Sequence, residues 1–442
     1  MMKYIVPALG TVAALSLFAF SVKDTTTAIA VERPSYDETF QQLELFANVL
    51  ASVRSDYVVD VENEALIEEA LNGMLQSLDP HSSYMNADAF RSMQTTTSGE
   101  YGGLGMEVTT EEGFVKVVAP FDDTPASRAG IEPGDYLTEI NGESLLGLSL
   151  TEAVEQMRGK PGEPITVTVV RSGEDDQMEL TMVREVIERK PVSAEVKDGL
   201  AYLRIAQFNE KTESSLKEGI EKVTKELGGR VPGVILDLRR NPGGLLDQSI
   251  KVSSVFLDGG EVVSTRGRRP NDVENYNAEK KELLKGVPLV VIIDNASASA
   301  SEIVAGAIQD RKRGLVIGKT SFGKGSVQSI LPLRGGRDGA LRLTTQRYYT
   351  PSGRSIQGSG IEPDLFISAQ LKDDEAEEFH ESDLPNAIIN ELEEAAKADD
   401  EEEIIVDYPP EGFDVEDGDY QLQRAIEILK DGSYAKLLNA AG

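Results

Sequence analysis

The sequence predicts a multidomain α+β protein, and three observations lead to this fold class. Its 442 residues are too many for one small core, because domains average about 150 residues. Residues 31–98 carry apolar side chains at helical spacing, and residues 99–187 combine short strands with tight turns. Residues 188–370 alternate near-continuous apolar strands with helical patterns, as an α/β core does.

The composition excludes several classes of protein. Hydrophobic residues make up 40% and charged residues 27%, which is typical of a folded globular chain and not of a disordered or polytopic membrane protein. The formal net charge of −32 argues against nucleic acid as a partner, because phosphate neutralisation needs a basic surface. No cysteine is present, and His81 and His380 are the two histidines, so thiol chemistry, cysteine-based zinc and three-histidine metal sites are excluded.

Residues 1–30 read as an export signal. Lys3 precedes an uncharged, mostly apolar run from Tyr4 to Val22, which fits a secretory signal and is near the lower limit for spanning a bilayer. Ala28-Ile29-Ala30 offers a small-x-small cleavage site. We therefore expect the rest of the chain in the periplasm or cell envelope, either released by cleavage or anchored in the inner membrane.

Residues 31–98 form the predicted helical region. Apolar side chains recur at helical spacing from Phe40 to Val49 and again from Leu66 to Met74. The pattern breaks at Leu78–Tyr84, where Asp-Pro favours a turn and Ser82 or Ser83 could cap a following helix.

Residues 99–187 form a compact, β-rich unit that opens with the glycine-rich segment Gly102–Met106. Asn141-Gly142 is typical of a tight turn between strands. The expected strands are Phe114–Ala119, Tyr136–Ile140, Ile165–Arg171 and Glu179–Val183, and the expected helices are Pro125–Gly130 and Leu150–Met157.

Residues 188–370 form the predicted α/β core, and residues 371–442 form an acidic C-terminal segment. Val234–Leu238 and Pro288–Ile293 are almost wholly apolar, as expected for strands of a sheet covered on both faces. The C-terminal segment contains a run of acids from Asp399 to Glu403, and such blocks are usually solvated. A short helix is expected near the end of the chain, and no motif assigns the segment a role.

Three serines, Ser297, Ser299 and Ser301, lie between a predicted strand and a predicted helix. A helix N-terminus favours negative charge and would stabilise the oxyanion that forms when a hydroxyl attacks a carbonyl. Serine is also a common residue at the start of a helix. The pattern alone therefore leaves open a structural role, and it leaves open which serine would be the nucleophile.

Lys324 lies between two glycines, and Phe322 comes directly before the first of them. Glycines let the backbone approach a second element closely, and a lysine near apolar groups loses solvation, so that its neutral amine can act as a base. Serine and neutral lysine together need no histidine. A solvated surface lysine is the alternative, and the spacing of a phosphate-binding loop is not met.

Asp237 and Arg239 follow a predicted strand and can pair at its end. Pro242-Gly243-Gly244 then forms a tight turn whose N–H groups could face a ligand, although a plain turn fits equally well.

In their order and spacing these motifs resemble the carboxyl-terminal processing peptidases, Ser/Lys serine proteases of family S41 with a PDZ domain. The resemblance extends from about residue 35 to residue 368. The motifs that carry it are Gly73-Met74, Leu78–Tyr84, Gly102–Met106, Asp237–Gly244, Ala296–Glu302, Phe322–Gln328, Thr350–Gly358 and Gly360–Asp364.

The resemblance implies a role for each of five positions. Ser299 would be the nucleophile and Lys324 the general base, and Gln328 would orient the lysine, one helical turn later if that stretch is helical. The oxyanion would be held by the amide of Ala300 and by a glycine amide of the Gly243-Gly244 turn, with Gly244 preferred. Both histidines are then bystanders, and neither a metal nor an organic cofactor is implied.

The resemblance also implies that residues 99–187 are a PDZ domain with two helices. Such domains add an extended peptide to a strand and hold its terminal carboxylate on backbone N–H groups. Gly103, Leu104, Gly105 and Met106 are the implied peptide-binding residues, although the two apolar side chains could equally be core. Arg158, in the turn after the second helix, is the candidate for coupling the PDZ domain to the active site.

These expectations combine into an exported endopeptidase with a crotonase-like protease core. It would bind protein or peptide substrates by their C-termini and cut them through an acyl-enzyme. An adaptor protein, and a second copy of the chain joined through the helical termini, are further partners that the resemblance suggests. A catalytically silent PDZ scaffold or chaperone-like binding protein is the alternative in another class, and an acyl-CoA enzyme on a similar core is a second one. The predicted export argues against the acyl-CoA enzyme, because CoA chemistry is intracellular.

Overall fold

The computed structural model describes residues 36–441 except 112, 122, 149, 172–176, 189, 373–377, 391–404 and 415–417. The predicted export signal and the whole acidic run from Asp399 to Glu403 therefore lie outside the described residues. Within the described part, no helix is both long enough and apolar enough to cross a membrane.

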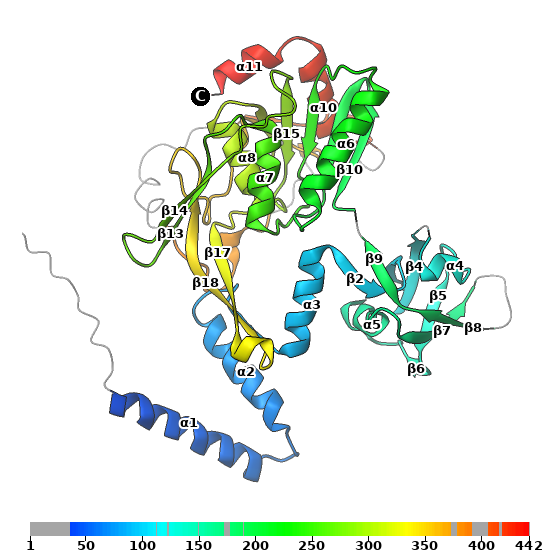
Figure 1. Cartoon of the computed structure of the whole chain (residues 1–442), viewed down its shortest axis with the longest axis vertical. Helices are drawn as coiled ribbons and strands as arrows, with labels where there is room; N and C mark the ends of the chain where they lie inside the picture. Colours follow the sequence, from blue (N-terminus) through cyan, green and yellow to red (C-terminus); the bar gives the residue numbers. More distant parts are fainter. Residues whose placement is uncertain are drawn as a thin grey trace, which may run out of the picture. The chain divides into compact units, whose positions relative to one another are not determined.

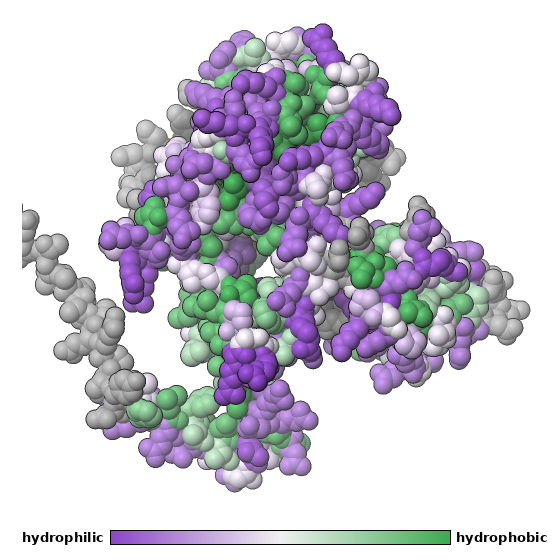
Figure 2. Space-filling view, in the orientation of Figure 1, coloured by the Kyte–Doolittle hydropathy of each residue, from purple (hydrophilic) through white to green (hydrophobic). Residues whose placement is uncertain are grey.

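The described chain forms two compact units that divide at residue 66. The first contains α1 (Tyr36–Asp56) and the start of α2 (Asn63–Gln76). The helical pattern predicted from the apolar spacing is confirmed. Leu43, Leu45 and Val49 on α1 are all more than half exposed, and Figure 2 shows hydrophobic residues along the surface of this helix.

The second unit begins with the rest of α2, followed by β1 (Ser83–Met85) and α3 (Ala87–Ser98). The cap of α3 is Asn86, whose side chain accepts the N–H of Ala89 at 2.9 Å. The expectation that Ser82 or Ser83 caps this helix is therefore wrong, because Ser83 already belongs to β1. That strand pairs antiparallel with β18 of the core.

The predicted PDZ domain is built around one antiparallel sheet, with strand order β3-β4-β5-β7-β8 in the described residues and β6 paired to β5. Its strands are β3 (Met106–Glu111), β4 (Phe114–Pro120), β5 (Tyr136–Ile140), β6 (Glu143–Ser144), β7 (Pro164–Val170) and β8 (Met178–Val183), and its helices are α4 (Pro125–Arg128) and α5 (Leu150–Met157). The predicted strands and helices are thus confirmed, whereas β3 was not predicted. The chain enters and leaves the domain through paired strands, β2 (Glu100–Gly103) and β9 (Glu185–Glu188).

The core of the second unit is a sheet with described strand order β10-β11-β12-β15-β16-β19-β20, in which all pairs except β10-β11 are parallel. Its strands are β10 (Val192–Lys197), β11 (Leu200–Ile205), β12 (Val234–Asp237), β15 (Leu289–Ile293), β16 (Leu315–Gly318), β19 (Leu365–Ile367) and β20 (Val406–Asp407).

Helices cover both faces of this sheet, as the apolar strands predicted (Figure 1). One face packs on α6 (Thr212–Glu226), α7 (Leu246–Phe256) and α8 (Ala300–Asp310). The other face packs on α10 (Tyr420–Lys430), with α11 (Tyr434–Ala440) beside it. The acidic C-terminal segment is therefore not simply a solvated tail, because its helix α10 completes the core.

A second sheet lies beside the first and joins β1, β18 (Ala340–Tyr349), β13 (Glu261–Gly267) and β14 (Val273–Asn277), with β17 (Ser326–Pro332) paired to β18. The β17–β18 ribbon begins two residues after Lys324. The whole architecture is a multidomain α+β fold, as the sequence predicts.

Candidate active site

Ser299 lies at the junction between β15 and α8, at the helix N-cap position. Its backbone has φ +54° and ψ −110°, a conformation that costs a non-glycine residue about 1–3 kcal/mol and that clusters at functional sites. Its N–H donates to Glu302 Oε2 at 2.5 Å. Ala300, the first residue of the helix, is fully buried.

The structure distinguishes the three serines that the sequence left ambiguous. Ser297 Oγ donates to Leu238 O at 2.9 Å, and Ser301 Oγ donates to Asn241 O at 2.9 Å. Both hydroxyls hold loops together and are fully buried. Ser299 instead lies next to the Tyr348 phenol, and burial raises the pKa of that phenol, so it stays protonated.

Lys324 lies in the loop between β16 and β17, and backbone hydrogen bonds fix this loop on every side. Its own N–H donates to Glu302 Oε2 at 3.0 Å. Other bonds run from Phe322 N to Ser297 O, from Gly325 N to Gln357 Oε1, from Tyr348 N to Gly325 O and from Gly358 N to Gly323 O. Such a loop keeps its lysine in one place.

Burial is the largest influence on the Lys324 ammonium and lowers its pKa. Four other charged groups also act on its pKa. Glu381, Glu302 and Asp79 oppose the shift and Arg342 adds to it. A lysine with a lowered pKa offers a larger fraction of neutral amine near neutral pH, which is what a general base needs.

Glu302 joins the serine and the lysine segments, and the sequence analysis gave it no role. Its Oε2 accepts from Ser299 N and Lys324 N, and its Oε1 accepts from Ser321 Oγ at 2.6 Å and Gly323 N at 2.7 Å. Burial outweighs these donors and raises the pKa of Glu302 to about 7. The spacing Ser299-x-x-Glu302 is that of a capping box, and this signal could have identified the residue.

Gln328 lies on a strand, β17, so the stretch is not helical and Gln328 does not follow Lys324 by one helical turn. Its Nε2 donates to Ser326 Oγ at 2.9 Å and to Thr344 Oγ1 at 3.3 Å. Thr344 Oγ1 in turn donates to Asp79 Oδ1 at 3.0 Å. Within the described residues no hydrogen bond joins Gln328 to Lys324, so its orienting role stays a prediction.

The Gly243-Gly244 turn lies against the start of α8. An added Cβ on Gly243 would come within 2.9 Å of both Ala300 N and Ser299 Cβ, and one on Gly244 would come within 2.1 Å of Phe208 O. Only glycine fits at either position. The Gly243 N–H already donates to Asn241 Oδ1 at 2.9 Å. Among the described residues the Gly244 N–H has no acceptor, which favours Gly244 over Gly243 as an oxyanion donor.

The strand end before this turn carries the predicted ion pair. Arg239 Nη2 lies 2.7 Å from Asp237 Oδ2 and also 2.7 Å from Asp419 Oδ2. Tyr202 Oη donates to the same Asp237 oxygen at 2.6 Å. Because Asp237 is fully buried, these partners fix the base of the turn and connect it to the start of α10.

The PDZ domain has a groove of about 450 Å³ between β3 and α5. Gly103, Leu104, Gly105 and Met106 lie at its edge, as the resemblance implies. The groove is also lined by Val108 and Phe121, by Val154, Met157 and Arg158, and by Glu107 and Lys190. Leu104 is 3% exposed, so it packs in the domain core as well, whereas Met106 is half-buried.

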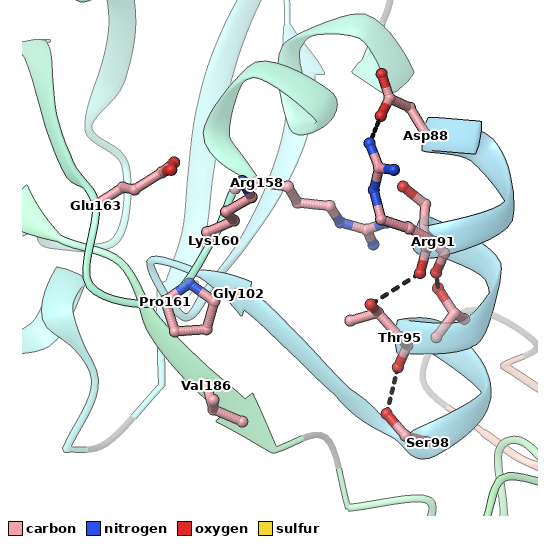
Figure 3. A pocket seen from close by; sticks show the side chains of 13 residues that line it. Asp88, Arg91, Thr95, Ser98, Gly102, Arg158, Lys160, Pro161, Glu163 and Val186 are labelled. Atoms are coloured by element: carbon pink, nitrogen blue, oxygen red, sulfur yellow. Dashed lines mark hydrogen bonds and ion pairs between the residues drawn. The ribbon is translucent and has the colours of Figure 1, made fainter. Parts of the chain in front are cut away.

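Arg158 follows α5 and lines a second cavity of about 590 Å³, between the PDZ domain and α3. Its side chain extends toward α3, where Arg91 pairs with Asp88 (Figure 3). The residue thus lies on both cavities. Its role in coupling the PDZ domain to the active site stays a prediction.

The histidines occupy structural positions. His81 Nε2 lies 2.8 Å from Glu381 Oε1, and His380 N donates to Asp383 Oδ2 at 2.8 Å. In the described residues no group of three or more His, Asp or Glu side chains is arranged to hold a metal ion.

Three family models match parts of this chain. They are "Activating protease CtpB N-terminal domain" at residues 5–89, "PDZ domain" at residues 116–171 and "Peptidase family S41" at residues 199–367.

Similar proteins carry related names. The carboxy-terminal-processing protease of Bartonella bacilliformis is 51% identical over 334 residues, which are 75% of this chain and 76% of that protein. A probable CtpA-like serine protease of Staphylococcus aureus is 34% identical over 323 residues, 72% of this chain but 64% of that protein. The solved photosystem II D1 C-terminal processing protease is 27% identical, with coverage of 75% and 88% and a TM-score of 0.44. The chain therefore belongs to peptidase family S41, as a serine-type carboxy-terminal-processing peptidase with a PDZ domain.

Proposed function

We propose that this peptidase is an exported endopeptidase that captures protein C-termini in its PDZ domain and cuts through an acyl-enzyme on Ser299. One observation supports this best: a single oxygen of Glu302 accepts the N–H groups of both Ser299 and Lys324. Two segments that are distant in sequence are thereby held on one buried carboxylate.

In the proposed reaction Lys324 acts as a neutral amine. It takes the proton of Ser299 as the serine oxygen attacks the scissile carbonyl, and it gives that proton to the leaving amine when the C–N bond breaks. Lys324 then takes a proton from the water molecule that attacks the ester, and it gives this proton to the Ser299 oxygen when the bond between that oxygen and the acyl carbon breaks, which releases the acid product and restores the enzyme. Atoms and charge balance without a metal or cofactor.

The oxyanion of each tetrahedral intermediate would be held by backbone amides. The Ala300 amide is at the first position of α8, where N–H groups have no partner within the helix, and the Gly244 amide is free of other acceptors in the described structure. One such donor contributes on the order of 3 kcal/mol to lowering the barrier. The helix dipole of α8 acts in the same direction.

Substrate capture is proposed for the groove between β3 and α5. A peptide added to β3 would place its last side chain against Met106, Val108 and Val154, while its carboxylate meets the N–H groups of the Gly103–Gly105 turn. Apolar C-terminal residues should therefore be preferred.

Export and self-association are proposed from the N-terminal part. The apolar run from Tyr4 to Val22 supports a periplasmic or cell-envelope location. The exposed apolar residues of α1, among them Leu43 and Val49, support pairing of two copies through this helix. Sedimentation should show a dimer that Leu43→Glu converts to a monomer; a wild-type monomer at micromolar concentration would contradict the pairing.

The test of the cleavage mechanism is mass spectrometry of fragments from an unfolded protein with an apolar C-terminus. Ser299→Ala should leave no fragments above background. Ser301→Ala removes a neighbouring hydroxyl that is bonded to Asn241 O, so it should lose about 1 kcal/mol of stability but still cut. Fragments at the wild-type rate from Ser299→Ala would refute the nucleophile, and failure of the wild type to cut any substrate would favour a binding protein.

A further inference from the structure

Two glycines flank Lys324, and the loop that follows β18 lies against both of them. An added Cβ on Gly323 would come within 3.0 Å of Gly358 C, and one on Gly325 would come within 2.4 Å of Gln357 N. Glycine at these two positions lets a second segment of the chain approach the backbone closely. The Gly-Lys-Gly sequence therefore has a physical reason, which is contact with Gln357 and Gly358.

The same loop is hydrogen-bonded to the backbone on each side of the lysine. The Gly358 N–H donates to Gly323 O at 2.8 Å, and Gln357 Oε1 accepts the N–H of Gly325 at 3.0 Å. This second N–H also reaches Gly323 O at 3.1 Å, within the lysine loop itself. The Gln357 side chain is thus the partner that ties Gly325 to another part of the protein, and it does so from a fully buried position.

The nitrogen of the Gln357 amide is held by residues 378–390, which come from the acidic C-terminal segment and are called the strap below. Gln357 Nε2 donates to Glu381 Oε1 at 3.1 Å and to Ile388 O at 3.3 Å. Glutamine suits this place because its side chain supplies both an acceptor and two donors. Glutamate would instead face the carboxylate of Glu381, so an amide is needed between the strap and the lysine loop.

The strap is itself anchored to the lysine loop and to the helical region. The Glu381 N–H donates to Phe322 O at 2.9 Å. His81 Nε2 lies 2.8 Å from Glu381 Oε1, and Asn386 Nδ2 donates to Gln76 O at 3.1 Å. Since these bonds fix the strap, the amide that it holds has little freedom to move away from Gly325.

We propose that Gln357 is a positioning residue for the general base: its amide holds the backbone at Gly325 and so fixes the point from which the Lys324 side chain extends. The inference rests on the proposed role of Lys324. It gives a task to the Thr350–Gly358 motif and to the C-terminal segment. A base must lie within hydrogen-bond reach of the proton that it removes, and a misplacement of about 1 Å can cost about 100-fold in rate.

Gln357→Met tests this role, because methionine has a similar length but offers neither the acceptor for Gly325 nor the donors to the strap. The lysine loop then loses its bond to the Gln357 side chain, while the groove between β3 and α5 is untouched. We expect kcat to fall at least about tenfold and KM to stay within about twofold. Hydrogen exchange, followed by mass spectrometry on the peptide spanning residues 322–326, should become faster.

Gln248→Met is the matched control. Gln248 is also a buried glutamine, its Oε1 accepts a backbone N–H, that of Glu213, at 3.1 Å, and its Nε2 donates to a carboxylate oxygen of Asp247 at 3.3 Å. These bonds join α6 to α7 and do not reach the lysine loop. The control should therefore keep the wild-type kcat and the wild-type exchange at residues 322–326.

The measurements use the full chain, an unfolded substrate with an apolar C-terminus, and circular dichroism to verify folding. Wild-type kcat or wild-type exchange at residues 322–326 in folded Gln357→Met would overturn the proposal. An equal loss of kcat in Gln357→Met and Gln248→Met would also overturn it, because general destabilisation would then explain both.

An exchange of two side chains decides the question if Gln357→Met does not fold. Gln357→Glu places two carboxylates together and should lower kcat. Adding Glu381→Gln restores one amide and one carboxylate, so that position 357 can again accept the Gly325 N–H, and kcat should rise at least about threefold above the single variant. A double variant that is unfolded, or no more active than Gln357→Glu, would overturn the proposal.

Failure of the underlying mechanism has a different signature. Failure of the wild type to cut, or cutting that survives in Ser299→Ala, would refute the proposed function. Hydrogen exchange at residues 322–326 needs no substrate, so it reports whether Gln357 holds the lysine loop in either case. The two failures are therefore distinguishable.

Discussion

Ser299 and Lys324 each adopt a state that an isolated residue would avoid, and Glu302 holds both. The serine has a positive φ and the lysine amine is largely removed from water. Strain and burial of this kind persist where the surrounding hydrogen bonds over-determine the geometry. Glu302 accepts hydrogen bonds from the backbone N–H groups of both segments. These bonds leave the serine and lysine backbones little freedom to separate.

Replacing Lys324 by methionine should abolish cleavage and raise stability. Because burial lowers the pKa of the folded-state amine, the unfolded chain binds protons more tightly and the folded state is destabilised below the pKa of a free lysine. The free energy of unfolding should rise by about 1 kcal/mol, with the gain shrinking as pH increases. Urea denaturation at two pH values measures this; a loss of stability would contradict it.

Replacing Glu302 by glutamine should lower kcat at least tenfold and lower the free energy of unfolding by about 1–3 kcal/mol. The amide nitrogen of glutamine cannot accept a hydrogen bond, so N–H donors that now reach the carboxylate would be left unsatisfied. Glu362→Gln, in the loop before β19, is the control and should leave both quantities unchanged. Steady-state kinetics measures kcat for both variants, and thermal unfolding measures their stability. Wild-type kinetics in folded Glu302→Gln would show that the carboxylate does not position the dyad.

Cleavage by the wild type should increase as pH rises through about 7. Burial raises the pKa of Glu302 to about 7, so its carboxylate forms fully only above that pH. The neutral fraction of Lys324 also grows with pH, and both changes favour activity. Measuring kcat/KM from about pH 5 to about pH 9, with circular dichroism to verify folding, tests this. A maximum at the acid end would contradict it.

At the scale of elements, both helices and most strands of the PDZ domain, and the core strands β12 and β15, followed from local patterns. Two local patterns were enough to predict several of these elements. The apolar runs at Val234 and Leu289 predicted buried strands, and Asn141-Gly142 predicted a tight turn between strands. Strand β3 was not predicted because its outer half, ending at Glu111, is exposed and polar. The strand assignment of Gln328 was also out of reach, since it depends on pairing with β18, a long-range contact that spacing cannot reveal.

Met106→Asp tests the groove between β3 and α5. A charge in an apolar groove should raise KM for a substrate with an apolar C-terminus about tenfold or more while leaving kcat nearly unchanged. Thr109→Asp adds the same charge to an exposed position of the same strand and should change neither. Peptide binding followed by fluorescence anisotropy gives the same comparison without catalysis; equal affinities for the two variants would place capture elsewhere.

At the scale of the whole molecule, the site is assembled from parts that are far apart in the chain. Asp79 follows α2, Ser299 begins α8, Lys324 precedes β17 and Glu381 comes from the C-terminal segment. The sequence pointed to Ser299 and Lys324 because they lie in compact motifs that carry the family resemblance; the pattern alone left the choice among three serines open. It could not identify Glu381 or the covering role of α10, because these depend on how an acidic segment returns to the core.

Ala425→Asp tests whether α10 is part of the core. Ala425 is fully buried against the sheet, so a carboxylate there would be buried without a partner and should destabilise the chain by more than about 3 kcal/mol. Gln423→Asp, on the exposed side of the same helix, should change stability by less than about 1 kcal/mol. Chemical denaturation compares them. Equal midpoints would mean that α10 adds little to the fold.

Labelling with a fluorophosphonate followed by peptide mapping tests the pairing of Ser299 with Lys324 most directly, because it needs no knowledge of the natural substrate. The wild type should carry one adduct on the peptide that contains Ser299, and folded Lys324→Met should react far more slowly or not at all. An adduct on another serine, or labelling of Lys324→Met at the wild-type rate, would contradict the account.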